Sequence, residues 1–153
     1  MRRFQHLSAA VAVVTALAAS LAFTAAADNP RLRVMPLGDS ITEGAGSAQG
    51  GGYRTPLYTM LKNLGYNVDL VGAYTANPSS ILTAAGEINH EGHGGWRISH
   101  PSLGLYEHLQ AWARSIETPN VILVHVGTND TNDNDFEHAI DRLDLLVDRL
   151  VEC

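Results

Sequence analysis

Three short apolar runs constrain the fold of this 153-residue chain most strongly, because segments of helical periodicity follow each of them. The runs are RLRVMPL (31–37), NVDLVG (67–72) and VILVHV (121–126). The last run is nearly continuous, which is typical of a central parallel strand buried on both faces. Strands that alternate with helices favour a parallel sheet covered by helices on both sides. The predicted fold class is therefore α/β with three layers.

Three amphipathic helices are expected between and after these strands. The first is predicted over 55–64, where Thr-Pro is typical of an N-cap followed by proline, and Gly65 ends it. The others are predicted over 105–116 and 136–151 from their apolar spacing. Residues 73–95 are rich in Gly, Asn, Pro and Ser and have no sustained period, so they are expected to form a long loop.

The first 27 residues differ in character from the rest of the chain. Arg2 and Arg3 precede an apolar run over 9–23, and small residues follow it, which is the pattern of a cleaved secretory signal peptide. A membrane anchor is the alternative, but the run of about 15 residues is shorter than the roughly 20 that span a bilayer. We therefore expect a signal peptide over 1–27, one domain over 28–153, and a secreted, extracellular protein.

The charge balance excludes several kinds of partner. Residues 28–153 carry 8 Lys+Arg against 16 Asp+Glu, which argues against binding of nucleic acid or an anionic membrane. The single cysteine, Cys153, excludes a disulfide framework and fits a chain that stops early. His90 and His93 invite a metal site, but H-E-G-H is one residue short of H-E-x-x-H and has no clear third ligand. No metal or cofactor is expected, and the protein is expected to be a monomer.

Polar clusters follow the first and third predicted strands. Gly38, Asp39 and Ser40 come after the first strand, and GTND (127–130) comes after the third. Ligand sites of open α/β sheets lie at the carboxyl ends of the strands, so the topology places Ser40 and Asn129 on one rim. A serine there can act as an acyl-transfer nucleophile, or it can simply cap the following helix.

The same clusters resemble the motifs of the SGNH hydrolases, also called GDSL esterases. GDSIT (38–42), HEGHGGW (90–96) and GTND occur in the family's order, and the resemblance runs from about Arg33 to the end of the chain. The stretches MPLGDSITEG, GGYR, EGHGGW and GTND are most similar to secreted carbohydrate esterases of family three, the acetylxylan esterase type. The resemblance implies a flavodoxin-like parallel sheet with helices on both faces.

The resemblance also implies a role for three residues. Ser40 would be the nucleophile, and the oxyanion hole would comprise the backbone N–H groups of Ser40 and Gly95 and the side-chain amide of Asn129. Glycine allows close approach of a backbone amide, and an asparagine amide is a neutral donor. Gly95 is preferred to Gly94 because it precedes Trp96 directly. The alternatives are an ordinary loop glycine and, for Asn129, a capping residue.

The general base is not apparent. The family carries its base and orienting acid in a late D-x-x-H segment, and the one D-x-x-H here is Asp135 to His138. Helical projection places His138 on the charged, solvent-facing side of the 136–151 helix, which argues against this pair. His125 is expected to be buried within its strand, and His93 to make a substrate or structural contact. The expectation is a chain that lacks its last strands and its catalytic D-x-x-H.

These observations predict a secreted serine esterase that removes acyl groups, expected to be acetyl, from a plant polysaccharide such as xylan. The substrate would be an acylated carbohydrate or another small ester. One alternative is an inactive truncated fragment, and another is a general carboxylesterase or lipase. A carbohydrate- or nucleotide-binding module is less favoured, because neither G-x-x-x-x-G-K-[ST] nor G-x-G-x-x-G occurs.

Overall fold

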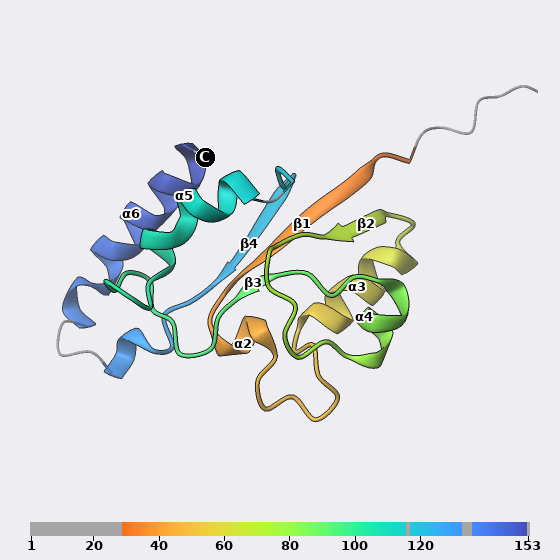
Figure 1. Ribbon diagram of the computed structural model, residues 1–153, viewed down its shortest axis with the longest axis horizontal. Helices are drawn as coiled ribbons and strands as arrows, with labels where there is room; N and C mark the ends of the chain where they lie inside the picture. Colours follow the sequence, from red (N-terminus) through yellow and green to blue (C-terminus); the bar gives the residue numbers. More distant parts are fainter. Residues whose placement is uncertain (1–28, 116, 133–135, 153) are drawn as a thin grey trace, which may run out of the picture. The chain divides into compact units, whose positions relative to one another are not determined.

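The computed structural model describes residues 29–115, 117–132 and 136–152 (Figure 1). The predicted signal peptide and Asp135 lie outside the described residues. Contacts divide the chain into Met1–Pro30 and Arg31–Cys153, and the second unit contains every helix and strand described below. None of the helices within the described ranges is both long and apolar enough to cross a membrane.

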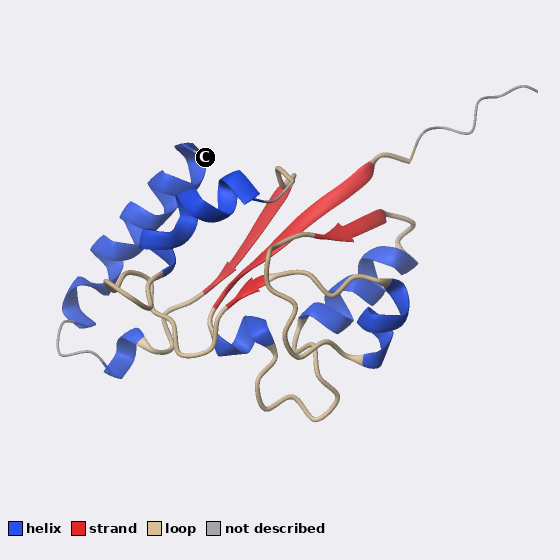
Figure 2. Cartoon of the chain, in the orientation of Figure 1, coloured by secondary structure: helices blue, strands red, loops and turns tan. Residues whose placement is uncertain are grey.

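The core of the second unit is a parallel sheet of four strands (Figure 2). The central strand is β1 (Arg31–Gly38). Strand β2 (Asn67–Leu70) pairs with its first half, and the two-residue β3 (Glu91–Gly92) pairs with its last two residues. Strand β4 (Val121–His125) pairs with 34–38 of β1. Because Val34 pairs with both β2 and β4, these two strands flank β1 on opposite sides.

Helices cover both faces of this sheet, as predicted. Helices α3 (Arg54–Asn63) and α4 (Ser80–Ala85) bury apolar side chains against Val34 and β2. Helices α5 (Leu105–Ser115) and α6 (Ala139–Glu152) pack on the other face, against Met35 and Leu37. The remaining elements are the short helix α2 (Ser40–Glu43) and the 3-10 turns η1 (Asp130–Asn132) and η2 (Phe136–His138). The three-layer α/β prediction is confirmed.

The predicted burial of VILVHV is wrong. Val121, Leu123 and His125 of β4 are exposed, whereas Ile122, Val124 and the following Val126 pack against the core. Among the described residues β4 pairs with β1 alone, and helices α3 and α4 cover β1 and β2 rather than β4. An apolar run records the tendency of a strand to be buried, whereas the neighbours decide which of its faces is covered.

The local structure differs from the prediction at the start of α3 and within residues 73–95. Thr55 does not cap α3, because the Thr55 hydroxyl donates to Ser79 Oγ at 2.8 Å. The helix begins one residue before Thr55, at Arg54. The expected loop over 73–95 contains α4 and β3. Ser79 caps α4 by accepting from Leu82 N–H, and Gly86 ends it with φ +77°. The helix has only six residues, too few to show a period in the sequence.

The buried face of the last helix is also rotated from the prediction. Projection of this helix at 100° per residue predicts one buried side that includes Ala139, Ile140, Leu146 and Val147. Ala139 and Leu146 are buried, but Ile140 and Val147 are exposed. Arg142 turns inward instead and lies 3.5 Å from the buried carboxylate of Asp130. The same projection places Arg142 on the solvent-facing side, so its partial burial beside Asp130 differs from the prediction.

Candidate active site at the carboxyl end of the sheet

The turn after β1 presents Ser40 as the first residue of a helix. Asp39 is the N-cap, and its Oδ1 accepts from the Ile41 N–H at 2.9 Å. Neither the backbone N–H nor the hydroxyl of Ser40 has a hydrogen-bond partner among the described residues. The alternative that Ser40 caps the helix is therefore wrong, and both of its polar groups are available to a ligand.

Gly38 allows this turn to lie tightly against β4. A Cβ at Gly38 would collide with the backbone carbonyl of His125 and with the hydroxyl of Thr42. Asp39 N–H also donates to His125 O at 3.4 Å, which links the turn to the end of β4. Only glycine permits this approach of two backbones, so the ends of β1 and β4 meet immediately before Ser40.

The glycine loop after β3 lies beside Ser40. His93 N–H donates to Gly38 O at 2.9 Å, and Gly94 N–H donates to Glu43 Oε2 at 2.7 Å. A Cβ built at Gly94 would lie 3.9 Å from the Cβ of Ser40, which is van der Waals contact. Gly95 follows with φ +82°, and its N–H has no acceptor within the described part of the chain. Gly94 and Gly95 thus differ: the N–H of the first is occupied and that of the second is open.

Asn129 lies at the same rim. Its half-buried side-chain nitrogen donates to the carbonyl of Trp96 at 2.7 Å. A primary amide carries two hydrogens, so one remains for a ligand. Asn129 is thereby tied to the residue that follows Gly95. The predicted residues Ser40, Gly95 and Asn129 come from three segments that one loop links: Gly94 lies beside Ser40, and Trp96 is bonded to Asn129.

Two further residues support this rim. Glu43 binds the glycine loop, and buried Arg54 donates to the carbonyls of Glu43, Ala76, Asn77 and Ile88 at 2.9 to 3.3 Å. Burial lowers the pKa of the Arg54 guanidinium, although nearby Glu43 opposes the shift. Neither role is predictable from the residue pattern. The one signal was the position of Arg54 in the GGYR stretch, since a lone arginine has no pattern of its own.

His90 and His93 are committed to contacts within the protein. His90 accepts from Gly92 N–H through Nδ1 at 2.9 Å, so Nε2 carries the proton and donates to Ala76 O at 3.0 Å. Burial, with the nearby Arg54 charge, lowers the pKa of His90 to about 4. His93 lies 2.8 Å from Glu91 through Nε2, and its ring stacks on Trp112 at 4.7 Å. These bonds favour a structural role for both rings.

The remaining candidates for a base, His138 and His125, are not hydrogen-bonded to the serine. His138 is 57% exposed, as predicted, and its Nδ1 lies 3.4 Å from Asp141. His125 is exposed rather than buried, and its ring centre lies 6.1 Å from that of Tyr53. Across the described ranges, no histidine is hydrogen-bonded to Ser40. No three His, Cys, Asp or Glu side chains in those ranges gather as metal ligands.

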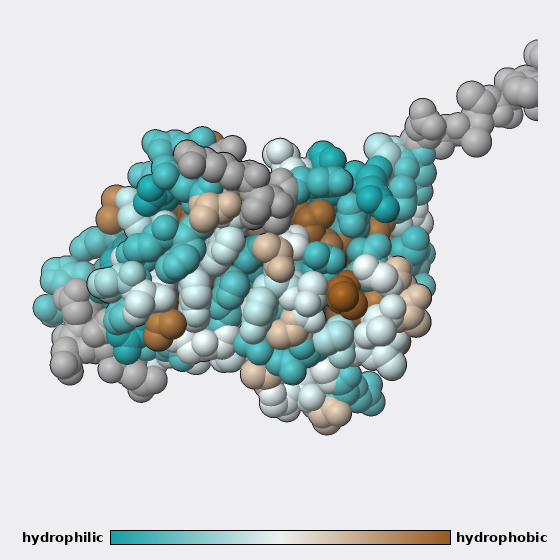
Figure 3. Space-filling model, viewed as in Figure 1, coloured by the Kyte–Doolittle hydropathy of each residue, from teal (hydrophilic) through white to brown (hydrophobic). Residues whose placement is uncertain are grey.

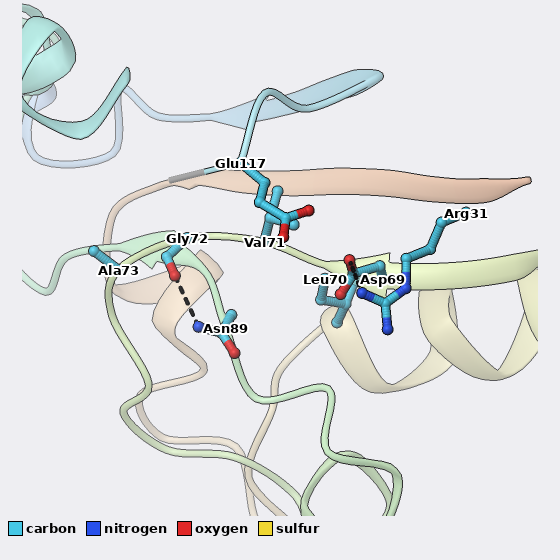
Figure 4. A pocket seen from close by; sticks show the side chains of 8 residues that line it. All are labelled: Arg31, Asp69, Leu70, Val71, Gly72, Ala73, Asn89 and Glu117. Atoms are coloured by element: carbon cyan, nitrogen blue, oxygen red, sulfur yellow. Dashed lines mark hydrogen bonds and ion pairs between the residues drawn. The ribbon is translucent and has the colours of Figure 1, made fainter. Parts of the chain in front are cut away.

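A separate hollow of about 290 Å³ lies beside β2 (Figure 4). Its charged walls are internally paired: Arg31 lies 3.1 Å from Asp69, and Glu117 lies 3.5 Å from Arg33. Neither Ser40 nor its proposed partners line this hollow. The view in Figure 3 shows a mostly hydrophilic surface with small, scattered apolar patches. The serine rim is therefore the stronger candidate site.

Comparison with known proteins finds esterases among the chains similar to this one. No protein-family model matches the chain. A multidomain esterase of Ruminococcus flavefaciens is 34% identical over 134 residues, which are 79% of this chain and 17% of that protein. A family 3 carbohydrate esterase of Clostridium thermocellum superposes with a TM-score of 0.57 at 30% identity, over 76% of this chain and 57% of that structure.

A second solved structure shows the same fold. The crystal structure of an acetyl esterase mutant with an acetate ion has a TM-score of 0.57 at 22% identity, over 78% of this chain and 55% of the other. The chain thus spans 17% of the length of the curated relative and 57% and 55% of the two solved structures. These likenesses confirm the parallel α/β architecture inferred from the strand order.

Proposed function

We propose, on the premise that this chain is related to the SGNH carbohydrate esterases and is by family a carboxylic ester hydrolase, that Ser40 is its nucleophile. The observation that carries the proposal is that one loop links Ser40 and Asn129: a Cβ at Gly94 would be in van der Waals contact with Ser40, and Asn129 is bonded to Trp96 in the same loop. Acyl transfer needs a nucleophile and nearby donors for the oxyanion. Both are present on this rim.

In the proposed reaction the Ser40 hydroxyl attacks the ester carbonyl. The carbonyl oxygen becomes an oxyanion that accepts hydrogen bonds from the Ser40 N–H, the Gly95 N–H and the second hydrogen of the Asn129 amide. The serine proton passes to a base and then to the leaving alcohol, and water later releases the acid from the acyl-enzyme. The open N–H of Gly95, against the occupied N–H of Gly94, supports the choice between the two glycines.

We propose acetyl groups on a polysaccharide such as xylan as the substrate, with the protein secreted and acting outside the cell. The supporting observations are the carbohydrate esterase among the structural neighbours and the acidic composition, which suits a neutral polymer. We propose further that the base is a histidine of a D-x-x-H segment outside residues 29–152. His90, His93 and His138 are bonded to other residues, and none of the described histidines is hydrogen-bonded to Ser40.

The second candidate function is an inactive fragment, which the isolated hydroxyl of Ser40 favours. Without a base, only the residual rate from binding and the oxyanion hole would remain. We therefore expect the 153-residue chain to hydrolyse p-nitrophenyl acetate no faster than its Ser40→Ala variant.

The decisive test follows the coding frame beyond the Cys153 codon. If the frame continues through D-x-x-H, we expect the longer protein to release acetate from acetylated xylan. Ser40→Ala should lower that rate by about 10⁴-fold or more, as expected when a triad member is lost, whereas Ser80→Ala, an exposed serine on α4, should not. A stop codon at that point would favour the inactive fragment. A Ser40-dependent rate in the short chain that His138→Ala abolishes would contradict our assignment of the base.

A further inference from the structure

The carboxylate of Glu43 lies between two segments that border the serine. Glu43 is three residues after Ser40, so the two side chains share a face of the short helix α2. Its Oε2 accepts from Gly94 N–H at 2.7 Å, and its Oε1 accepts from the Asn77 side-chain nitrogen at 2.7 Å. Each carboxylate oxygen thus holds a different loop.

The bond from Gly94 determines where the next amide lies. A Cβ at Gly94 would lie 2.6 Å from Glu43 Oε2, so the loop backbone lies close against the carboxylate, and a side chain at this position would have to displace it. Peptide bonds are planar, so only the φ and ψ angles of Gly94 separate its N–H from the N–H of Gly95. The bond to Glu43 therefore anchors the loop one residue before the Gly95 N–H, which is open within the described chain.

We propose that Glu43 is a positioning residue, whose carboxylate holds Gly94 so that the Gly95 N–H points at the oxyanion formed at Ser40. The inference rests on the proposed function, because it assigns Gly95 to the oxyanion hole. A hydrogen bond to an ionised group is stronger than a neutral one. Glu43 links the helix that carries the nucleophile directly to the loop that carries the donor.

The backbone of Glu43 is held as well. Its carbonyl accepts from Arg54 at 2.9 Å, and the same guanidinium donates to the carbonyls of Ala76 and Asn77. Arg54 thereby fixes the backbone on both sides of the Glu43–Asn77 contact. Because its backbone is held, the Glu43 side chain has few conformations to lose when it bonds Gly94. The position of the Glu43 carboxylate is therefore defined before substrate binds.

The test uses the ¹⁵N-labelled 153-residue chain and acetate as the probe, followed by NMR at pH 7. Acetate should shift the amide signals of Ser40, Gly95 and the Asn129 side chain. Glu43→Ala should speed hydrogen exchange at Gly94 and weaken acetate binding about tenfold, the scale of a lost hydrogen bond to a charged group. Removing a negative charge would by itself strengthen binding of an anion, so weakening reports on the geometry.

Two variants serve as controls. Glu43→Gln should restore most of the affinity, because its amide oxygen can accept from Gly94 while the exposed Asn77 amide turns to accept from its nitrogen. Asn77→Gly, at a residue with φ +50°, should leave acetate affinity unchanged, since the Gly94 bond uses the other carboxylate oxygen. The dispersed signals of the Leu146 core should persist in every variant.

The outcomes separate the two claims. If acetate shifts none of the three donors in the unaltered chain, the oxyanion hole is wrongly assigned and both the proposed function and the role of Glu43 fail. If acetate binds the unaltered chain and Glu43→Ala equally well, only the positioning role is refuted. Weaker binding in Glu43→Ala that Glu43→Gln does not restore would also contradict it, because the loss would then follow the charge and not the Gly94 bond.

Discussion

Replacing Arg54 with leucine tests whether one buried cation holds the loops around the serine. The Arg54 side chain is fully buried, and its two terminal nitrogens donate to four carbonyls at 2.9, 3.1, 3.2 and 3.3 Å. Arg54→Leu keeps an apolar stem of similar width but removes every donor. The four carbonyls would then lack this partner in a region that solvent reaches poorly.

The expected loss is large but smaller than a sum over bonds. A hydrogen bond to a charged group contributes about 1.5–3 kcal/mol. Desolvation of the guanidinium, which also lowers its pKa, offsets part of that total. Removing one partner of a buried charged network costs about 3–5 kcal/mol. We therefore expect Arg54→Leu to lower the free energy of unfolding by about 4 kcal/mol.

Equilibrium unfolding in urea, followed by circular dichroism, measures this loss. With a slope of about 2 kcal/mol per molar urea, the midpoint should fall by about 2 M. Arg31→Leu is the matched control, because the Arg31 side chain is 61% exposed and makes a salt bridge to Asp69 at 3.1 Å. Exposed pairs contribute about 0–1 kcal/mol. A loss from Arg54→Leu no larger than that from Arg31→Leu would refute the reasoning.

Three other substitutions give distinct outcomes. Gly38→Ala should prevent the close approach of β1 and β4, since its Cβ would meet the carbonyl of His125, and a thermal melt should show a lower midpoint than the wild type. Leu146 has no exposed surface, so Leu146→Ala should lower the free energy of unfolding in urea by about 2–5 kcal/mol. Leu145 is 54% exposed, so Leu145→Ala should change it by no more than about 0.5 kcal/mol. Equal losses would contradict the assigned buried face. The pKa of His90 is about 4 in the folded chain, below its value of about 6.5 in the unfolded chain. Between these two pH values only the unfolded chain binds the proton. The free energy of unfolding therefore falls as the pH drops from about 6.5 to about 4. His90→Gln should flatten the stability difference between pH 7 and pH 5, and an unchanged difference would count against the buried neutral ring.

Much of the site was predictable because polar residues at the ends of apolar strands carry topological information. Parallel strands bring their carboxyl ends to one edge, so the residues after β1 and β4 had to be neighbours. The motif order then pointed to the glycine loop between them. The role of Asp39 as the helix cap was not separated from that of Ser40, because both residue types favour that position.

The supporting residues were not predictable from the same reasoning. Arg54 and Glu43 act through carbonyls and amides of loops that lie 11 to 51 positions away in the sequence. Such bonds leave no period and no spacing rule. The exposed face of β4 and the rotated face of α6 escaped for a related reason, since burial depends on which neighbour covers a strand or helix.

The sequence by itself determined three of the four described strands, the parallel α/β architecture and the identity of the residues at the sheet edge. These follow from local apolar runs and from the geometry of crossover connections, which any chain with this pattern must obey. Tertiary structure alone decided that the Gly94 N–H is occupied while that of Gly95 is open, and that no described histidine is hydrogen-bonded to Ser40. The physical reason is that hydrogen bonds between distant loops depend on three-dimensional distances, which a linear pattern of residues does not contain.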